Sequence, residues 1–151
     1  MKFKKMLAVL LTSVLLLTFS LPASAAPGIG DTKNTALTLL PSQVIKLFLA
    51  ADSSDKDWYK WTNNTGEDKF VSVDVFLSGG STTDFRLGYI IDYGNNRETY
   101  IAYTDTLYGG NIMSFDYLYL TAGSTVYFVI EHAPGKNVSA QYDLVWYIKN
   151  L

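Results

Sequence analysis

The sequence predicts an all-β protein of about eight antiparallel strands, arranged as a sandwich or a barrel. Two observations lead to this prediction. Apolar and polar residues alternate along several short runs, which is the pattern of strands that bury one face. Clusters of Gly, Asn, Ser and Pro separate these runs at intervals of about 8–12 residues, as the turns of a sandwich do.

The N-terminal segment has the features of a signal peptide. Basic residues come first, an apolar run follows over residues 6–21, and small residues end the segment at Ala23, Ser24 and Ala25. We expect cleavage after Ala25, which leaves one domain at residues 26–151. The alternative is an uncleaved membrane anchor, but the apolar run is shorter than the roughly 20 residues that a spanning helix needs. After cleavage we expect no attachment to a membrane.

The runs that follow are short enough for strands. In chain order we expect strands at residues 43–50, 58–62, 70–77, 85–91, 99–104, 114–120, 126–130 and 142–148. The alternation is clearest at Val71, Val73, Val75 and Leu77, whose side chains are expected in the core. The same period predicts inward-facing stripes in three later runs: Phe85, Leu87, Tyr89 and Ile91; Val126, Phe128 and Ile130; Tyr142, Leu144, Trp146 and Ile148.

Turns and one helix-like run complete the chain. Turn-forming clusters lie at residues 63–66, 79–81, 94–96, 109–111, 122–124 and 134–137. The helix-like run, residues 35–40, is too short to form a layer of its own. Trp58, Trp61 and Trp146 are expected to pack in the core or along strands.

Composition and charge narrow the class of function. The chain has no Cys, so no disulfide braces the fold. Removal of the signal peptide takes 3 of the 12 basic residues and none of the 14 acidic ones, leaving a formal net charge of −5. A mildly acidic domain is a poor partner for nucleic acid or for anionic lipid. We expect a secreted, extracellular protein from a Gram-positive type of bacterium.

Four segments together resemble a known family. They are residues 30–36, the triplet Asp57-Trp58-Tyr59, residues 120–123 with the strand at 126–129, and the triplet Tyr142-Asp143-Leu144. In order and spacing they are similar to the conserved elements of the bacterial pre-peptidase C-terminal domain family, whose relatives include the collagen-binding domains of clostridial collagenases. The resemblance implies a jelly-roll-like sandwich. It also implies an accessory role beside secreted hydrolases, in secretion, folding or attachment to a substrate.

Acidic residues gather ahead of the aromatic strand at 58–62. A loop dense in Asp suits a hard cation such as calcium, which takes several oxygen ligands. The resemblance implies a calcium site in which Asp31 and Asp57 match ligand positions, and Asp55 lies close enough in sequence to join them. The alternative is that these acids cap turns or solvate the loop. No other cofactor is expected.

Aromatic residues are abundant, with 11 Tyr, 8 Phe and 3 Trp. If Leu118 and Leu120 point inward, Tyr117 and Tyr119 stand on the outer face of their strand, and Tyr103 lies nearby in sequence. Flat rings with a hydroxyl stack on sugars and on extended peptides, so these three tyrosines are the predicted ligand-binding residues. The alternative is that Tyr is simply a good strand former.

Catalysis is not expected. The chain has one His, no Cys and no nucleophile elbow. His132 is predicted at the surface, at the end of a strand. A glycosidase needs two carboxylates across a cleft, and the best available pair is Glu131 with Asp116.

The sequence therefore favours a secreted, non-catalytic and monomeric binding module that attaches to cell wall, polysaccharide or fibrous protein. Two alternatives stay open. One is a structural or assembly protein of the extracellular matrix, in which strands at 126–131 and 142–149 pair between chains from sheet edges. The other is a partner or folding aid that acts in trans on a secreted peptidase.

Overall fold

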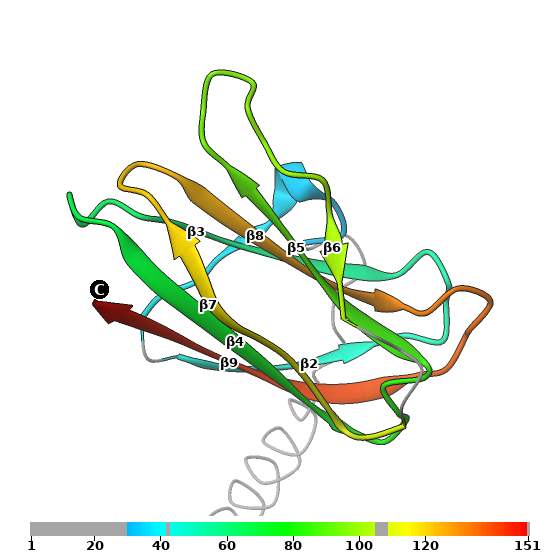
Figure 1. The fold of residues 1–151 in the computed structure, drawn as a ribbon. Coiled ribbons are helices and arrows are strands. Elements are labelled where there is room, and N and C mark those ends of the chain that lie inside the picture. The colour runs from blue at the N-terminus through cyan, green and yellow to red at the C-terminus, as the bar shows by residue number, and fades with distance from the viewer. Residues whose placement is uncertain (1–29, 42, 105–108, 151) are drawn as a thin grey trace, which may run out of the picture.

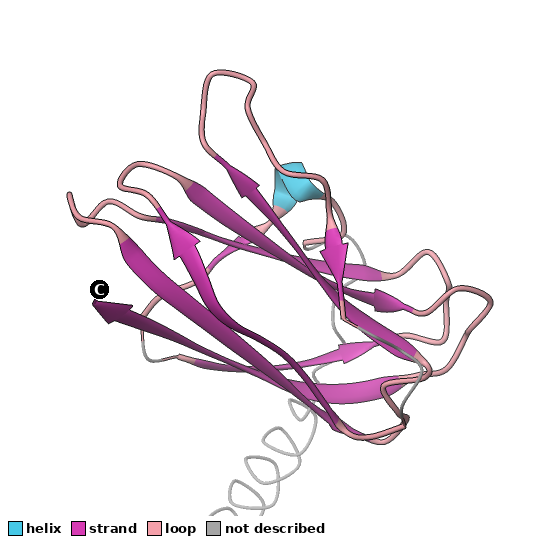
Figure 2. Ribbon diagram, in the orientation of Figure 1, coloured by secondary structure: helices cyan, strands magenta, loops and turns pink. Residues whose placement is uncertain are grey.

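The computed structural model describes residues 30–41, 43–104 and 109–150. Two β-sheets face each other across one hydrophobic core (Figure 1, Figure 2). The predicted signal peptide, residues 1–25, lies outside the described residues. Within them, no helix is long and apolar enough to cross a membrane.

Nine strands and one short 3-10 helix make up the described chain. The helix is η1 (Lys33–Thr35), and the strands are β1 (Leu37–Thr38), β2 (Val44–Leu49), β3 (Lys56–Thr62), β4 (Lys69–Ser78), β5 (Phe85–Asp92), β6 (Ala102–Tyr103), β7 (Ile112–Leu120), β8 (Thr125–His132) and β9 (Ala140–Asn150). Each of the eight predicted strands is present, from β2 to β9. The prediction at 99–104 is confirmed only at its centre, where β6 pairs with two residues of β5.

The sheet topology confirms the predicted sandwich. One sheet has the order β1-β3-β8-β5-β6 and the other the order β2-β9-β4-β7. Strands β2 to β9 pair antiparallel, and successive strands alternate between the sheets except at the β5–β6 hairpin, which is the double Greek-key arrangement of a jelly roll. Strand β8, which contains the predicted edge segment 126–131, lies between β3 and β5. The alternative in which this segment pairs between chains required a sheet edge, and the segment does not lie at one.

Strand β1 departs from the prediction because it pairs parallel with β3. The chain leaves β1 for β2 in the other sheet and returns to β3, so β1 and β3 run in the same direction. The helix-like run at 35–40 contains this strand. The helical turn lies just ahead of it, capped by reciprocal hydrogen bonds between Thr32 and Thr35.

The core consists of the predicted stripes. Val71, Val73 and Val75 are fully buried, as are the inward-facing side chains of β8 and most of those of β5 and β9. Trp61 and Trp146 meet across the core with ring centroids 5.5 Å apart. Alternation predicts these positions because a side chain on a strand points to the opposite face from its neighbour.

Candidate functional site

The outer face of the β2-β9-β4-β7 sheet carries a cluster of three rings, Phe70, Tyr117 and Tyr119, which we call the aromatic platform. Phe70 lies between the two tyrosines, and its ring centroid is 6.0 Å from each, in edge-on geometry. Tyr117 is 59% exposed and Tyr119 is 45% exposed. Both tyrosines predicted to face outward do so, and the structure brings them together on one surface.

A β-bulge in β7 places the two tyrosines side by side. Val71 pairs with Leu118 and Val73 pairs with Phe115, so two residues of β7 stand opposite Ser72 alone. Tyr117 is the residue of the bulge that adopts the left-handed conformation, with φ 55°. Its backbone N–H donates to the Ser72 hydroxyl at 3.1 Å. The left-handed region is unfavourable for a residue with a large side chain, by about 1–2 kcal/mol. Such strain in a native structure is a reason to ask what the side chain does there.

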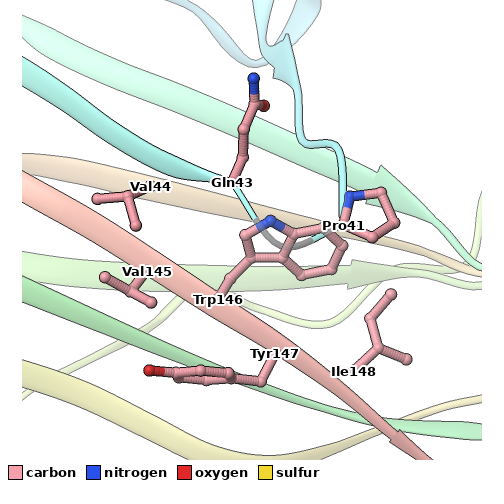
Figure 3. Close-up of a pocket in the computed structure, with 7 residues that line it drawn as sticks. All are labelled: Pro41, Gln43, Val44, Val145, Trp146, Tyr147 and Ile148. Carbon is pink, nitrogen blue, oxygen red and sulfur yellow. The ribbon is translucent and has the colours of Figure 1, made fainter.

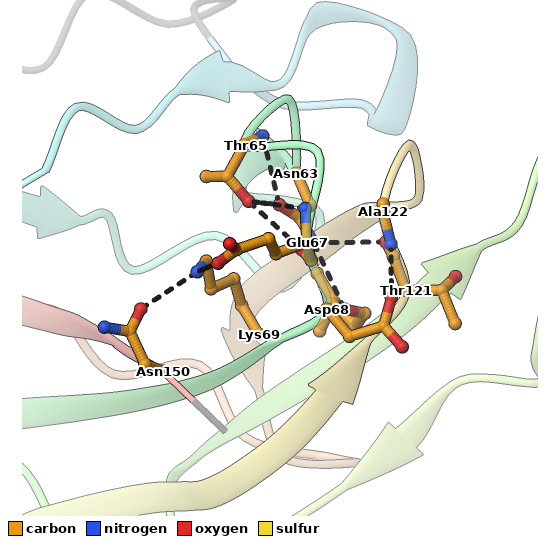
Figure 4. Close-up of polar contacts among 9 residues, drawn as sticks. Asn63, Thr65, Glu67, Asp68, Lys69, Thr121, Ala122 and Asn150 are labelled. Atoms are coloured by element: carbon orange, nitrogen blue, oxygen red, sulfur yellow. Dashed lines mark hydrogen bonds and ion pairs between the residues drawn. The ribbon is translucent and has the colours of Figure 1, made fainter.

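Tyr119 is held at its hydroxyl. The O–H donates to a carboxylate oxygen of Asp68. The other oxygen of this carboxylate accepts the Ala122 N–H at 2.9 Å (Figure 4). The hydrogen bond from Tyr119 lowers the pKa of Asp68, and the same bond raises the pKa of Tyr119. The ring of Tyr119 is therefore held in orientation while the residue stays exposed to solvent.

The end of the sandwich beneath Tyr119 is cross-linked by buried polar groups (Figure 4). The Asn63 side-chain amide, which is fully buried, donates to the carbonyl oxygens of Glu67, Leu120 and Thr121 at 2.8, 3.1 and 3.2 Å. The buried Lys69 ammonium donates to Glu67 at 2.8 Å and to Asn150 at 2.9 Å. These bonds join the turns that flank β4 and β7, so the platform rests on a rigid base.

A cation lies beside the platform. The Lys149 ammonium is 4.7 Å from the ring centroid of Tyr117, a cation–π distance. Sequence reasoning did not single out Lys149 or Phe70. The alternation does place both residues on the outward face of their strands. The β4–β9 register then brings Phe70 and Lys149 opposite each other.

Tyr103, the third predicted binding residue, lies on the other sheet. It pairs with Gly88 of β5, and the Arg86 guanidinium stacks 3.8 Å from its ring centroid. Burial, followed by a hydrogen bond to Glu131, raises the pKa of Tyr103 to about 12. The three predicted tyrosines therefore do not form one surface.

Glu131 and His132 have structural partners. Glu131 is buried and forms ion pairs with Lys56 and Arg86. Burial favours the neutral acid, but hydrogen bonds from these partners and Tyr103 outweigh it and lower the pKa of Glu131. The prediction that His132 lies at the surface is wrong. The residue is 5% exposed, its ring packs at a tilt against Phe85 with centroids 5.2 Å apart, and its Nε2 lies 2.9 Å from the Val138 carbonyl oxygen.

Asp57 of the predicted calcium site lies inside the sandwich. It is 6% exposed and accepts a 2.6 Å hydrogen bond from the Tyr142 hydroxyl, which is itself 2.5 Å from the Tyr59 hydroxyl. Burial raises the pKa of Asp57 to about 6, with smaller contributions from the charges of Asp55 and Asp31. The inward position follows from β3, where Asp57, Tyr59 and Trp61 share one face.

The other loop acids cap backbone groups. Asp55 accepts the Ala50 N–H at 2.6 Å, and Asp52 accepts the N–H and hydroxyl of Ser54 at 2.9 and 2.8 Å. Asp31 and Asp55 act on Asp57 through their charge. Across the described part of the chain, no three His, Cys, Asp or Glu side chains come close enough to hold a metal ion. Asp31, Asp55 and Asp57 therefore do not form a preorganised metal site, and calcium binding stays a prediction.

Calcium binding has a direct test in thermal melts of residues 26–151. An ion held only by the native state raises the midpoint by mass action, and Asp31→Asn should remove most of the rise. The control is Asp92→Asn, because Asp92 lies outside both the acidic loop at residues 52–57 and the segment that contains Asp31. This variant should show the full calcium-dependent rise in the midpoint. A midpoint that is the same in millimolar calcium and in chelator would reject the site.

Comparison with known proteins shows that this chain shares its fold with a solved domain. No family model matches the sequence. No curated protein matches it either. Among solved structures, the chain is similar to the pre-peptidase C-terminal domain of a collagenase from Bacillus anthracis, a crystal structure at 1.0 Å. The two share 16% identity with a TM-score of 0.50, over 76% of this chain and 94% of that domain. The chain therefore has the fold of a pre-peptidase C-terminal domain, as its sequence motifs indicated.

Proposed function

We propose that the protein is a secreted, non-catalytic accessory module that attaches to an extracellular polymer through the aromatic platform. The observation that carries the proposal is the strained bulge that turns Tyr117 outward beside Tyr119. The fold supports an accessory role, since it is shared with a domain of a bacterial collagenase. Export follows from the signal peptide that the sequence predicts.

The shape of the platform suits a polymer better than a small molecule. Its rings lie on the outer face of a sheet, where both tyrosines are exposed, whereas small ligands are usually enclosed in concave pockets. Stacking on flat rings provides apolar contact, and the Tyr117 hydroxyl and the Lys149 ammonium add polar contacts at its edge. Cell-wall glycan, other polysaccharides and fibrous proteins all offer repeated surfaces of this kind.

Depletion assays on insoluble peptidoglycan, cellulose, chitin and collagen test the proposal. We expect residues 26–151 to bind at least one of these polymers. Replacing Tyr117 or Tyr119 by alanine removes a central aromatic contact and should weaken binding by about tenfold or more. The matched control is Tyr100→Ala, because Tyr100 is 98% exposed and lies in the connection between β5 and β6, away from the platform.

The controls distinguish binding at the aromatic platform from nonspecific binding by exposed tyrosines. If Tyr100→Ala weakens binding as much as Tyr117→Ala, exposed tyrosines bind without a site and the platform is not the binding surface. Retention on none of the four polymers would contradict the proposed function. Tyr103→Ala should have little effect, since Tyr103 lies on the opposite sheet.

A further inference from the structure

Strand β9 is longer than its neighbour β2. The pairing of β2 with β9 runs from Ala140 to Val145, whereas β4 pairs with β9 as far as Asn150. Residues 146–150, the free edge, therefore have no strand beside them on the β2 side anywhere in the described chain. Figure 1 shows β9 continuing beyond the start of β2. A row of unpaired backbone groups of this length is a template for another strand.

The path of the chain explains why β2 stops short. The Leu39 N–H still bonds to Lys60 in the first sheet at 2.8 Å, and the next carbonyl, of Leu40, accepts the Trp146 indole N–H at 3.0 Å. Pro41 follows, and proline has no N–H to give to a ladder. The chain is thus crossing between sheets where it would otherwise pair with the free edge.

The free edge borders a groove of about 380 Å³ (Figure 3). Pro41 and Val44 line it from the β2 side, and Tyr147 and Ile148 line it from β9. Tyr147 is 46% exposed and points to the same face as the platform, and Ile148 is partly buried and packs on the core. The groove is lined mainly by apolar side chains, which can pack against the apolar side chains of an added strand.

Other sheet edges in the described residues carry features that discourage pairing. β1 and β6 are two residues long, and the hydroxyls of Thr99 and Thr104 accept N–H groups of β5. β7 is broken by its bulge, and β2 has Lys46 near its middle. Short strands, bulges and edge lysines are the devices by which natural sheets avoid association. The free edge of β9 has neither a bulge nor a proline, although it carries one lysine, Lys149.

The free edge is complementary to itself. An antiparallel pairing that uses all five residues has a two-fold axis through Ile148, the middle residue, because residues directly opposite each other must share a face. Ile148 then meets Ile148 of the second copy on the inner face. On the outer face Tyr147 stands opposite Lys149, and this cation–π pair occurs twice because of the symmetry.

We propose that the free edge of β9 binds the free edge of a second copy of this chain, antiparallel about Ile148, in a weak two-fold dimer. The sequence alone favours a monomer, whereas the unequal lengths of β2 and β9 create an edge suited to self-association. The dimer joins the β2-β9-β4-β7 sheets of the two copies into one continuous sheet, with both aromatic platforms on the same face. Two platforms on one face would bind a repetitive polymer with avidity; this consequence rests on the proposed function, but the pairing does not.

Sedimentation analysis of residues 26–151 without any polymer tests the dimer. We expect a dimer fraction that rises with concentration up to the millimolar range. Tyr147→Lys places two lysines opposite each other at both symmetry-related positions and should lower the association constant about tenfold. Adding Lys149→Glu to that variant restores an attractive pair and should return association to near the original value.

The control is Phe76→Lys, an exposed aromatic on the same outer face but on β4, which should leave association unchanged. A chain that stays monomeric throughout the concentration range overturns the proposal. So does a charge-swapped double variant that associates no better than Tyr147→Lys alone, provided that circular dichroism shows both variants folded. Because no polymer is present, this result is independent of the depletion assays.

Discussion

Replacing Trp146 by alanine is expected to destabilise the domain by about 4 kcal/mol, the largest single effect that the structure predicts. The indole is 2% exposed and packs against Trp61, so its removal leaves a large cavity between the sheets. It also removes the hydrogen bond that fixes Leu40 where the chain crosses from β1 to β2. Urea denaturation followed by fluorescence or circular dichroism measures the change.

The neighbouring residue provides the matched control for Trp146. Tyr147 lies on the same strand with its ring outward and 46% exposed, so Tyr147→Ala should change stability by less than about 1 kcal/mol. Comparable losses for the two variants would contradict the assignment of Trp146 to the core and of Tyr147 to the surface.

The second large effect is a gain in stability when Asp57 becomes asparagine. Asp57 has a folded-state pKa of about 6, raised first by burial, against 3.8 in the unfolded chain. Its native carboxyl therefore holds a proton more tightly than the unfolded one. Stability falls as pH rises between about 4 and 6, and above that range the ionised carboxylate costs about 3 kcal/mol. Asparagine still accepts from Tyr142 but carries no charge.

We therefore expect Asp57→Asn to raise the free energy of unfolding by about 2–3 kcal/mol at pH 8 and by little at pH 3. The measurement is urea denaturation across this pH range in chelator, so that bound cation does not offset the charge. Tyr142→Phe is the companion variant. It removes the hydroxyl that stabilises the carboxylate, and should destabilise the protein more at pH 8 than at pH 3. A pH-independent effect of Asp57→Asn would contradict the account.

Alternation in the sequence was sufficient to predict the sandwich because burial on a strand has a period of two. Val71 to Leu77 and Val126 to Ile130 show the pattern and occupy the core. The same reasoning placed Tyr117 and Tyr119 on the outer face. It did not predict the bulge at Asp116 and Tyr117, because a left-handed residue in a strand is usually Gly, and here that residue is Tyr117.

The misplaced residues depend on contacts between distant segments. His132 follows a strand and precedes a Pro-Gly turn, which is typical of a surface position, yet Phe85 and the Val138 carbonyl enclose it. Asp57 looks like a loop ligand beside Asp55, but β3 begins one residue before it and turns it inward toward Tyr142. The free edge of β9 depends on where β2 starts, and the sequence shows neither the pairing nor its length.

If the strained bulge presents Tyr117 for binding, the variant Tyr117→Gly, which relaxes the backbone and removes the ring, must lose binding. Glycine accepts φ 55° without strain, so this variant should be about 1 kcal/mol more stable than Tyr117→Ala, which keeps the strain and also lacks the ring. The measurement is depletion by whichever polymer retains the unmodified chain. We expect Tyr117→Gly, folded and relieved of strain, to lose binding as fully as Tyr117→Ala. Retention equal to that of the unmodified chain would contradict this expectation.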